Sequence, residues 1–222
     1  MRICFTSDTH GHHLKLDIPT CDLLIHCGDF SNNGTNDELF AFNAWVRRLK
    51  ASGRIKRCYV VPGNHDRSLD GLVESEGRRL QYEAARDLLD EVDDVWINSG
   101  TTIDGISFWG FSFIPPCGTN FGFQRTEEVM ARLVEVPLRR ASTDVFVSHG
   151  PPWGVLDVNL QRHHMGCGHL LGLIKKLKPR YHFFGHVHGN CGVSNIGETV
   201  CCNVASGGYE VKTPIILDIT QK

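Results

Sequence analysis

The sequence predicts an α/β protein in which two mixed β-sheets pack face to face and helices cover their outer faces. Two observations predict this class. Short apolar runs alternate with segments of helical period through the first half of the chain, as in βαβ units, and the last third is rich in short strands. The length of 222 residues, of which 41% are hydrophobic and 22% charged, suits one globular domain spanning 1–222.

Three strands and one long helix are predicted in the first half. Residues 2–7 and 23–27 are apolar runs that end in Gly or Asp, and 57–61 ends at a Pro-Gly pair. A helix is expected over 35–50, because a capping box begins at Thr35 and apolar residues follow at three-to-four spacing.

The rest of the chain continues this alternation. The remaining helices are expected over 78–89, 126–136 and 168–178, and prolines stop the last two. The remaining strands are expected within 95–113, where turns interrupt them, and at 144–148, 181–184, 193–196, 200–204 and 214–219.

Charge and hydropathy exclude several classes of function. The formal net charge of -2 offers no broad cationic surface for nucleic acid. The longest stretch without ionisable side chains other than Cys, 105–124, contains two prolines and four glycines, so we expect no membrane span. Residues 2–5 already have the character of a strand rather than of a signal peptide, and the expected location is the cytoplasm.

The nine cysteines do not form a recognisable disulfide or zinc pattern. No Cys-x-x-Cys occurs, and Cys4, Cys27, Cys58 and Cys201 fall in or near apolar runs, where a thiol behaves as a small hydrophobe. The adjacent Cys201 and Cys202 are expected to face opposite sides of one strand.

Polar side chains follow five of the predicted strands. These are Asp8 and His10, then Asp29, Asn64 with His65 and Asp66, His149, and finally His186 and His188. In α/β sheets the loops at strand ends converge on one crevice, so we expect these groups to lie together. Carboxylate, amide oxygen and imidazole without thiolate suit divalent ions such as Mn, Fe, Zn, Ni or Co. Without His65 and Asp66 this set supplies seven donors, which exceed what one tetrahedral ion uses and suit two ions that share a bridging carboxylate.

The ordered set Asp-x-His, Gly-Asp, Gly-Asn-His-Asp, His-Gly and Gly-His-x-His resembles the calcineurin-like metallophosphoesterase superfamily. Further segments resemble its metallophosphoesterase-domain-containing (UPF0046-like) subgroup: Ser7-Asp8-Thr9-His10, His26-Cys27-Gly28-Asp29-Phe30, Phe42-Asn43-x-Trp45, Ser148-His149-Gly150-Pro151-Pro152 and Gly166-Cys167. The resemblance implies a four-layer α-β-β-α sandwich with the metals at the edge between the sheets.

The resemblance also implies the division of the ligands between two divalent transition-metal ions, with Mn²⁺ as the first candidate. One ion would be held by Asp8, His10, Asp29 and His188. The other would be held by Asp29, Asn64, His149 and His186, with Asp29 as the bridge. Many superfamily members have Asp where this chain has Asn32, whereas His186, lost in some animal members, is retained. Its retention favours an active centre.

The function implied is hydrolysis of small phosphodiesters, with cyclic nucleotides as candidate substrates, through in-line attack by a metal-bridging hydroxide. We further hypothesise that His65 protonates the leaving oxygen or donates to the phosphoryl group, and that Asp66 orients the ring of His65. The expected partner is therefore a small phosphoester, with a nucleotide among the candidates, and not a membrane or a long nucleic acid.

Three alternatives remain open on the residues alone. The two metals do not distinguish diesters from monoesters, so a phosphomonoesterase or phosphoprotein phosphatase is the first alternative. A non-catalytic scaffold of the same fold is the second, although all seven ligand positions are occupied by suitable residues. Nucleic-acid binding or nuclease action is the third, and the balanced charge disfavours it.

Other histidines receive structural interpretations. His26 and His182 lie within predicted strands and are expected to be core residues with a hydrogen-bond partner. His12 and His13 are candidates to line the pocket. The three that flank the 166–168 loop, His163, His164 and His169, are expected at the surface.

Overall fold

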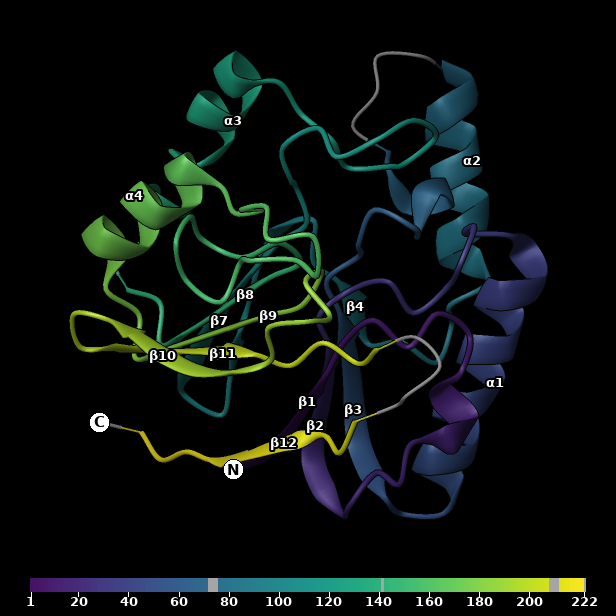
Figure 1. Cartoon of the computed structure of the whole chain (residues 1–222). Coiled ribbons are helices and arrows are strands. Elements are labelled where there is room, and N and C mark those ends of the chain that lie inside the picture. The colour runs from purple at the N-terminus through teal and green to yellow at the C-terminus, as the bar shows by residue number, and fades with distance from the viewer. Residues whose placement is uncertain (72–75, 141, 208–211, 222) are drawn as a thin grey trace.

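The computed structural model describes residues 1–71, 76–140, 142–207 and 212–221. It contains two sheets with helices on both outer sides (Figure 1). The first sheet has the order β12-β1-β2-β3-β4. Its strands are β1 (Arg2–Thr6), β2 (Cys21–His26), β3 (Ile55–Val60), β4 (Asp94–Val95) and β12 (Ile215–Asp218). The first four run parallel, and β12 pairs antiparallel with β1.

The second sheet has the order β10-β11-β9-β8-β7-β5, with β6 paired to β7. Its strands are β5 (Asn98–Ser99), β6 (Thr102–Ile103), β7 (Ile106–Phe111), β8 (Val145–Ser148), β9 (Tyr181–Phe184), β10 (Gly192–Ile196) and β11 (Thr199–Asn203). Strands β7, β8, β9 and β11 are parallel to their neighbours in this order, and the outer pairs are antiparallel. Both sheets are therefore mixed, as expected.

The helices form the two outer layers. They are α1 (Asn36–Ala51), α2 (Glu76–Asp87), α3 (Glu127–Leu133) and α4 (Gly168–Leu177), with short 3-10 turns at His13–Lys15, Arg67–Leu69 and Pro137–Arg139. Helices α1 and α2 lie on the side of the first sheet, and α3 and α4 on the side of the second (Figure 1). The capping box predicted at the start of α1 is present: Thr35 accepts from the backbone of Glu38, whose carboxylate accepts in return. Helix α3 ends three residues before the predicted limit, and Pro137 begins a separate turn.

The two sheets meet through an apolar layer. Phe5 of β1 and Phe183 of β9 stack with ring centroids 3.6 Å apart, and Trp96 stacks against Tyr59 at 4.6 Å. A second apolar cluster lies between the outer faces of the two sheets and the helices that cover them. It includes Phe42 of α1. The expected four-layer α-β-β-α sandwich is thus confirmed.

Two further predictions concern the adjacent cysteines and a membrane span. Cys201 and Cys202 are buried in different apolar clusters, as their opposite orientation predicts. None of the helices within the described residues is both long and apolar enough for a membrane span.

Candidate metal centre

The loops that follow β1, β2, β3, β8 and β9 converge at one edge of the sandwich. Backbone hydrogen bonds join them: the N–H of Asp8 donates to the carbonyl of Gly28 at 2.9 Å, and the N–H of His10 donates to the carbonyl of Asp29 at 3.0 Å. These strands are parallel within each sheet, so their carboxyl ends open on the same side. The topology therefore brings all seven predicted ligand residues to this edge.

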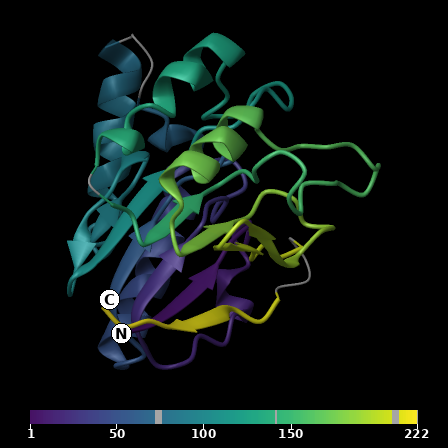
Figure 2. The ribbon, with the colours of Figure 1, turned by 90° about the vertical axis from the view of Figure 1, so that its left-hand side faces the viewer.

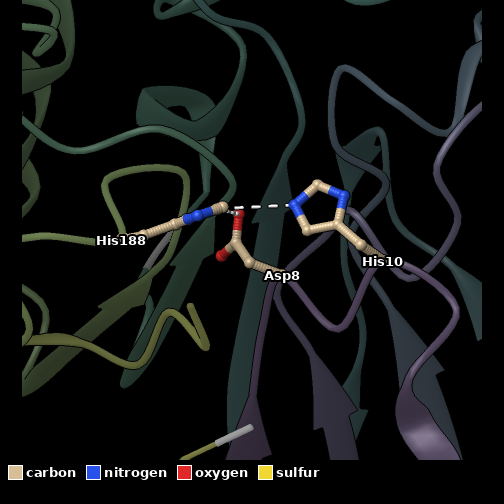
Figure 3. A group of neighbouring side chains, drawn as sticks. All are labelled: Asp8, His10 and His188. Atoms are coloured by element: carbon tan, nitrogen blue, oxygen red, sulfur yellow. Dashed lines mark hydrogen bonds and ion pairs between the residues drawn. The ribbon is translucent and has the colours of Figure 1, made fainter. Parts of the chain in front are cut away.

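One group contains Asp8, His10 and His188, which come from the loops after β1 and β9 (Figure 3). The Nε2 atoms of His10 and His188 are 3.4 Å apart, and His188 Nε2 is 3.2 Å from Asp8 Oδ1. The Asp8 carboxylate also accepts from the backbone N–H of His186 at 2.9 Å, which ties the β9 loop to β1. The group is part of one predicted ligand set.

A second group contains Asp29, His149 and His186. His149 Nε2 lies 3.4 Å from Asp29 Oδ2 and 3.0 Å from Asn64 Oδ1. The other ring nitrogen, Nδ1, lies 3.0 Å from the carbonyl of Cys27, which can only accept, so Nδ1 carries a proton. This arrangement leaves Nε2 as the coordinating atom, the usual orientation of a metal-binding imidazole.

Asp29 lies between the two groups. Its Oδ2 is 4.0 Å from His10 Nε2 and 3.4 Å from His149 Nε2. Its Oδ1 accepts from the backbone N–H of His65 at 2.8 Å, which fixes the carboxylate plane. The side chain is only 3% exposed, so water contributes little to its solvation. This is the position that a bridging ligand would need.

Unusual backbone conformations accompany these ligands. Asp8, His10, Asp29 and His186 have φ of 57°, 43°, 54° and 68°. Non-glycine residues rarely adopt this left-handed region, and they cluster at functional sites when they do. The strand-to-loop turns here thus direct side chains back over the edge of the sheets.

Two glycines in the motifs make room for the carboxylates. A Cβ on Gly63 would meet Asp29 Oδ1 and would lie 2.6 Å from its backbone nitrogen. A Cβ on Gly185 would collide with Asp8 Oδ2 and with the hydroxyl of Ser7. These motif glycines therefore act through close approach and not through special φ angles.

The electrostatics of the cluster are those of buried carboxylates beside imidazoles. Burial alone would lower the pKa of His149, but the Asp29 carboxylate outweighs it and raises that pKa to about 9. Burial would raise the pKa of Asp29, yet His149 and the other nearby imidazoles lower it. Burial lowers the pKa of His186 to about 4, which keeps this ring neutral and ready to coordinate.

The residues present fit a divalent metal. His10 directs its Nε2 toward Asp29 and His188, and the described residues contain three overlapping groups of His and Asp side chains, in each of which the ligand atoms lie within 4.8 Å of one another. Oxygen and imidazole donors without thiolate match hard or borderline divalent ions. That these side chains bind two such ions remains a prediction.

His65 and Asp66 occupy different environments. His65 Nδ1 is 2.6 Å from the carbonyl of Asn32, so the backbone at Asn32 orients this ring. The fully buried carboxylate of Asp66 instead accepts from the backbones of Asp29 and Gly63 at 2.8 and 2.9 Å and from the hydroxyl of Ser31. The prediction that Asp66 orients the His65 ring is wrong, because this carboxylate is saturated by the loops it joins.

His65 also lies close enough to belong to the metal cluster. One of its ring nitrogens is within 4.8 Å of a nitrogen of His10 and an oxygen of Asp29. From the sequence, His65 was predicted to act only beside the metals. The Gly-Asn-His spacing does not distinguish a metal ligand from a proton donor to the substrate, since both roles place His65 in the same loop.

The remaining histidines follow the structural interpretations in part. His26 and His182 are fully buried and contact the hydroxyls of Thr9 and Ser148 at 3.0 and 2.8 Å, which confirms them as core residues. His12 lines the pocket, whereas His13 is buried against the rings of Phe42 and Trp45. His163 and His164 are exposed, as expected, and His164 pairs with Asp157, whereas His169 lies in α4, is partly buried and pairs with Glu127.

A pocket of about 530 Å³ opens over the cluster. Its polar residues include His10, Asp29, Asn64, His65, His186 and His188. Its apolar residues include Phe121, Leu160, Met165 and Val187, and none of the described residues that line it is Lys or Arg. These walls could not be predicted from the sequence, because no local pattern indicates that the loops around 121 and 160 reach the strand ends.

Comparison with known proteins gives consistent relationships. A family model for calcineurin-like phosphoesterase matches residues 1–190. The UPF0046 protein K07C11.7 of Caenorhabditis elegans is 35% identical over 231 residues, which cover 100% of this chain and 76% of that protein. Metallophosphoesterase domain-containing protein 1 of Homo sapiens is 30% identical over 239 residues, which cover 98% of this chain and 71% of that protein.

A solved structure, that of TT1561 of Thermus thermophilus, is similar in fold. It aligns with a TM-score of 0.59 and 13% identity over 91% of this chain and 88% of that chain. With a family model over most of the chain and relatives similar along its length, the chain belongs to the calcineurin-like phosphoesterase family.

Proposed function

We propose that this metallophosphoesterase hydrolyses small phosphodiesters, with cyclic nucleotides among the candidate substrates. Its family supports a metal-dependent phosphoester hydrolase, and two divalent metals are typical of that family. The choice of diesters rests on one observation: no Lys or Arg is among the described residues that line the pocket.

The charge of the substrate makes this observation relevant. A phosphodiester carries one negative charge, whereas a phosphomonoester approaches two near neutral pH because its second pKa is about 6. Guanidinium or ammonium groups commonly bind such additional charge. A pocket that combines the His and Asp cluster with apolar walls supports a singly charged ester with organic substituents on both sides.

The residues of the chain have separable roles in this proposal. Asp8, His10, Asp29 and His188 would hold one metal, and Asp29, Asn64, His149 and His186 the other. When bound, such ions supply positive charge to the phosphoryl group and make water acidic enough to provide a nucleophile at neutral pH.

His65 would act on the leaving group. Because its Nδ1–H donates to the carbonyl of Asn32, Nε2 is the nitrogen available to a substrate. His65 lies in the pocket beside His10, with ring centroids 4.7 Å apart. From there, with both ring nitrogens protonated, Nε2–H would donate its proton to the leaving oxygen or a hydrogen bond to the phosphoryl group.

The proposal includes a small phosphoester as the partner and the cytoplasm as the location. All nine cysteines are free thiols, and Cys4, Cys21, Cys27 and Cys58 are among those that are buried. Free thiols in this number are typical of a reducing compartment.

A substrate panel on Mn²⁺-reconstituted protein tests the proposal. It compares bis(4-nitrophenyl) phosphate with 4-nitrophenyl phosphate, and includes 2′,3′- and 3′,5′-cyclic nucleotides. We expect kcat/KM to be higher for the diester than for the monoester. The reverse order would indicate a phosphomonoesterase, and absence of turnover together with fewer than two bound metals would indicate a scaffold.

A further inference from the structure

We propose that the pocket binds the two substituents of a linear phosphodiester in separate apolar subsites, one at Phe121 and one at Leu160. The inference rests on the proposed phosphodiesterase function and specifies its substrate class. It assigns a specificity role to two side chains that lie outside the motifs of the metal centre.

The imidazoles of the site connect the two subsites. The ring of Phe121 lies 4.8 Å from that of His65, which lies 4.7 Å from His10, which in turn lies 5.2 Å from His188. Leu160 lies on the other flank, because a Cβ on Gly189, the residue after His188, would lie 2.8 Å from the Cδ2 of Leu160. Phe121 and Leu160 therefore flank the cluster where the phosphoryl group would bind.

The Phe121 subsite is held by hydrogen bonds to the metal loop. The N–H of Gly122 donates to the carbonyl of Asn64 at 2.8 Å, and the N–H of Phe123 donates to Asp70 at 2.8 Å. Asp70 is buried and forms an ion pair with Arg125. This segment cannot move away from the cluster without breaking these contacts, so Phe121 is preorganised.

The Leu160 subsite is part of the loop between β8 and α4, which extends from the sheets (the green loop in Figure 2). Asp157, itself 1% exposed, shapes this loop by accepting from the N–H groups of Gly154 and Gly166 and from His164. Leu160 is 81% exposed although it lines the pocket. A large apolar side chain held at a pocket mouth gains burial only when something covers it.

The geometry matches the shape of a linear diester. The phosphorus of such an ester carries two organic groups that extend in different directions, so one group reaches each flank. A monoester has only one organic group, and a cyclic diester joins both ester oxygens in one ring, so either would occupy one flank. A volume of about 530 Å³ is within the size range of small-molecule sites.

Binding measurements on metal-loaded protein test the two subsites. The probes are diphenyl phosphate, which has two aromatic arms, and dimethyl phosphate, which has none, measured by titration calorimetry. The variants are Phe121→Ala, Phe121→Leu, Leu160→Ser and the double variant Phe121→Ala with Leu160→Ser. The matched controls are Phe40→Ala and Leu80→Ser, which alter exposed apolar residues on α1 and α2.

We expect Phe121→Ala and Leu160→Ser each to weaken binding of diphenyl phosphate by about 3- to 10-fold, the scale of one apolar or aromatic contact. Phe121→Leu should lose less, because it keeps apolar area. The double variant should show the product of the two single losses, since separate subsites act independently. Binding of dimethyl phosphate and the metal content should match the controls.

Unchanged binding of diphenyl phosphate in either single variant would overturn the inference. Equal losses for both probes would also overturn it, because the side chain would then support the cluster and not a substituent. If the wild type hydrolyses diesters while the variants behave in these ways, the proposed function stands and only the subsites fail. If the wild type hydrolyses no diester, the proposed function itself fails.

Discussion

Two histidines on neighbouring strands show what separates a ligand from a core residue. His149 directly follows β8, and His182 lies within β9, the strand that pairs with β8. Both side chains are fully buried. Burial lowers the pKa of His182 to about 3, with no carboxylate opposing it. Beside His149 the carboxylate of Asp29 reverses the effect of burial and raises the pKa to about 9.

The difference teaches that burial alone does not identify a functional histidine. The ring of His182 contacts the hydroxyl of Ser148 and packs edge-on against Phe146, whereas His149 faces Asp29 and Asn64. The strand end, where loops from both sheets meet, is where oxygen donors converge on an imidazole. The strand interior surrounds the imidazole with apolar groups.

The largest effect should come from the shared carboxylate. Asp29→Asn keeps the size of the side chain but removes its charge, and Asp29 lies within 4.0 Å of both His10 and His149. We expect kcat on bis(4-nitrophenyl) phosphate to fall by more than about 10²-fold, the scale for loss of one preorganised charge-stabilising group. Steady-state kinetics at saturating Mn²⁺ measure this effect. Activity within threefold of wild type would contradict a shared role for Asp29.

The comparison of His149 with His182 gives the next prediction. His149→Ala should bind one metal fewer per chain after dialysis, because it removes a coordinating nitrogen, whereas His182→Ala should retain the wild-type number. Elemental analysis by mass spectrometry measures the metal content. We expect His182→Ala to lose stability instead, by about 1–3 kcal/mol, since Ser148 loses a buried partner. Equal metal loss in both variants would break the distinction.

The smallest effect concerns acid stability. His182 has a pKa of about 3 in the folded state, below its usual value of 6.5, so below pH 6.5 the unfolded chain binds a proton that the folded chain does not. This group therefore lowers the free energy of unfolding as pH falls from 6.5 towards 3, by up to about 1.4 kcal/mol per pH unit.

His182→Phe should reduce that dependence. Urea unfolding of wild type and variant at pH 7, 6 and 5 gives the measurement, and the variant should lose less stability between pH 7 and 5. A Leu80→Ser control, at an exposed position of α2, should keep the wild-type slope. Parallel curves for wild type and His182→Phe would mean that His182 becomes protonated within the folded protein.

Local signals explain why much of the fold could be predicted. Thr35 and Glu38 form their capping box within four residues of chain, and the strand limits follow from apolar runs a few residues long. The order of strands in the sheets required contacts that no local pattern encodes. Strand β12, for example, pairs with β1 although 208 residues separate their nearest ends in the chain.

The site shows the same division. The seven ligand positions were accessible because each follows a strand within a short motif, and the structure brings them together. The role of Asp66 was wrongly predicted because proximity to His65 in the sequence suggested a contact, whereas the carboxylate reaches Asp29 and Ser31. Backbone direction at a turn, and not sequence distance, decides which neighbour a side chain meets.

The amino-acid sequence by itself determined the kinds of donor atoms and the strand ends at which they occur. Only the tertiary structure decided that Phe121 and Leu160 flank the imidazoles of the site. The physical reason is range: strand and cap formation depend on neighbours a few residues away. The site instead forms only when the two sheets pack together, because its side chains come from loops of both sheets. Asp8 and His188, for example, are 180 residues apart in the chain.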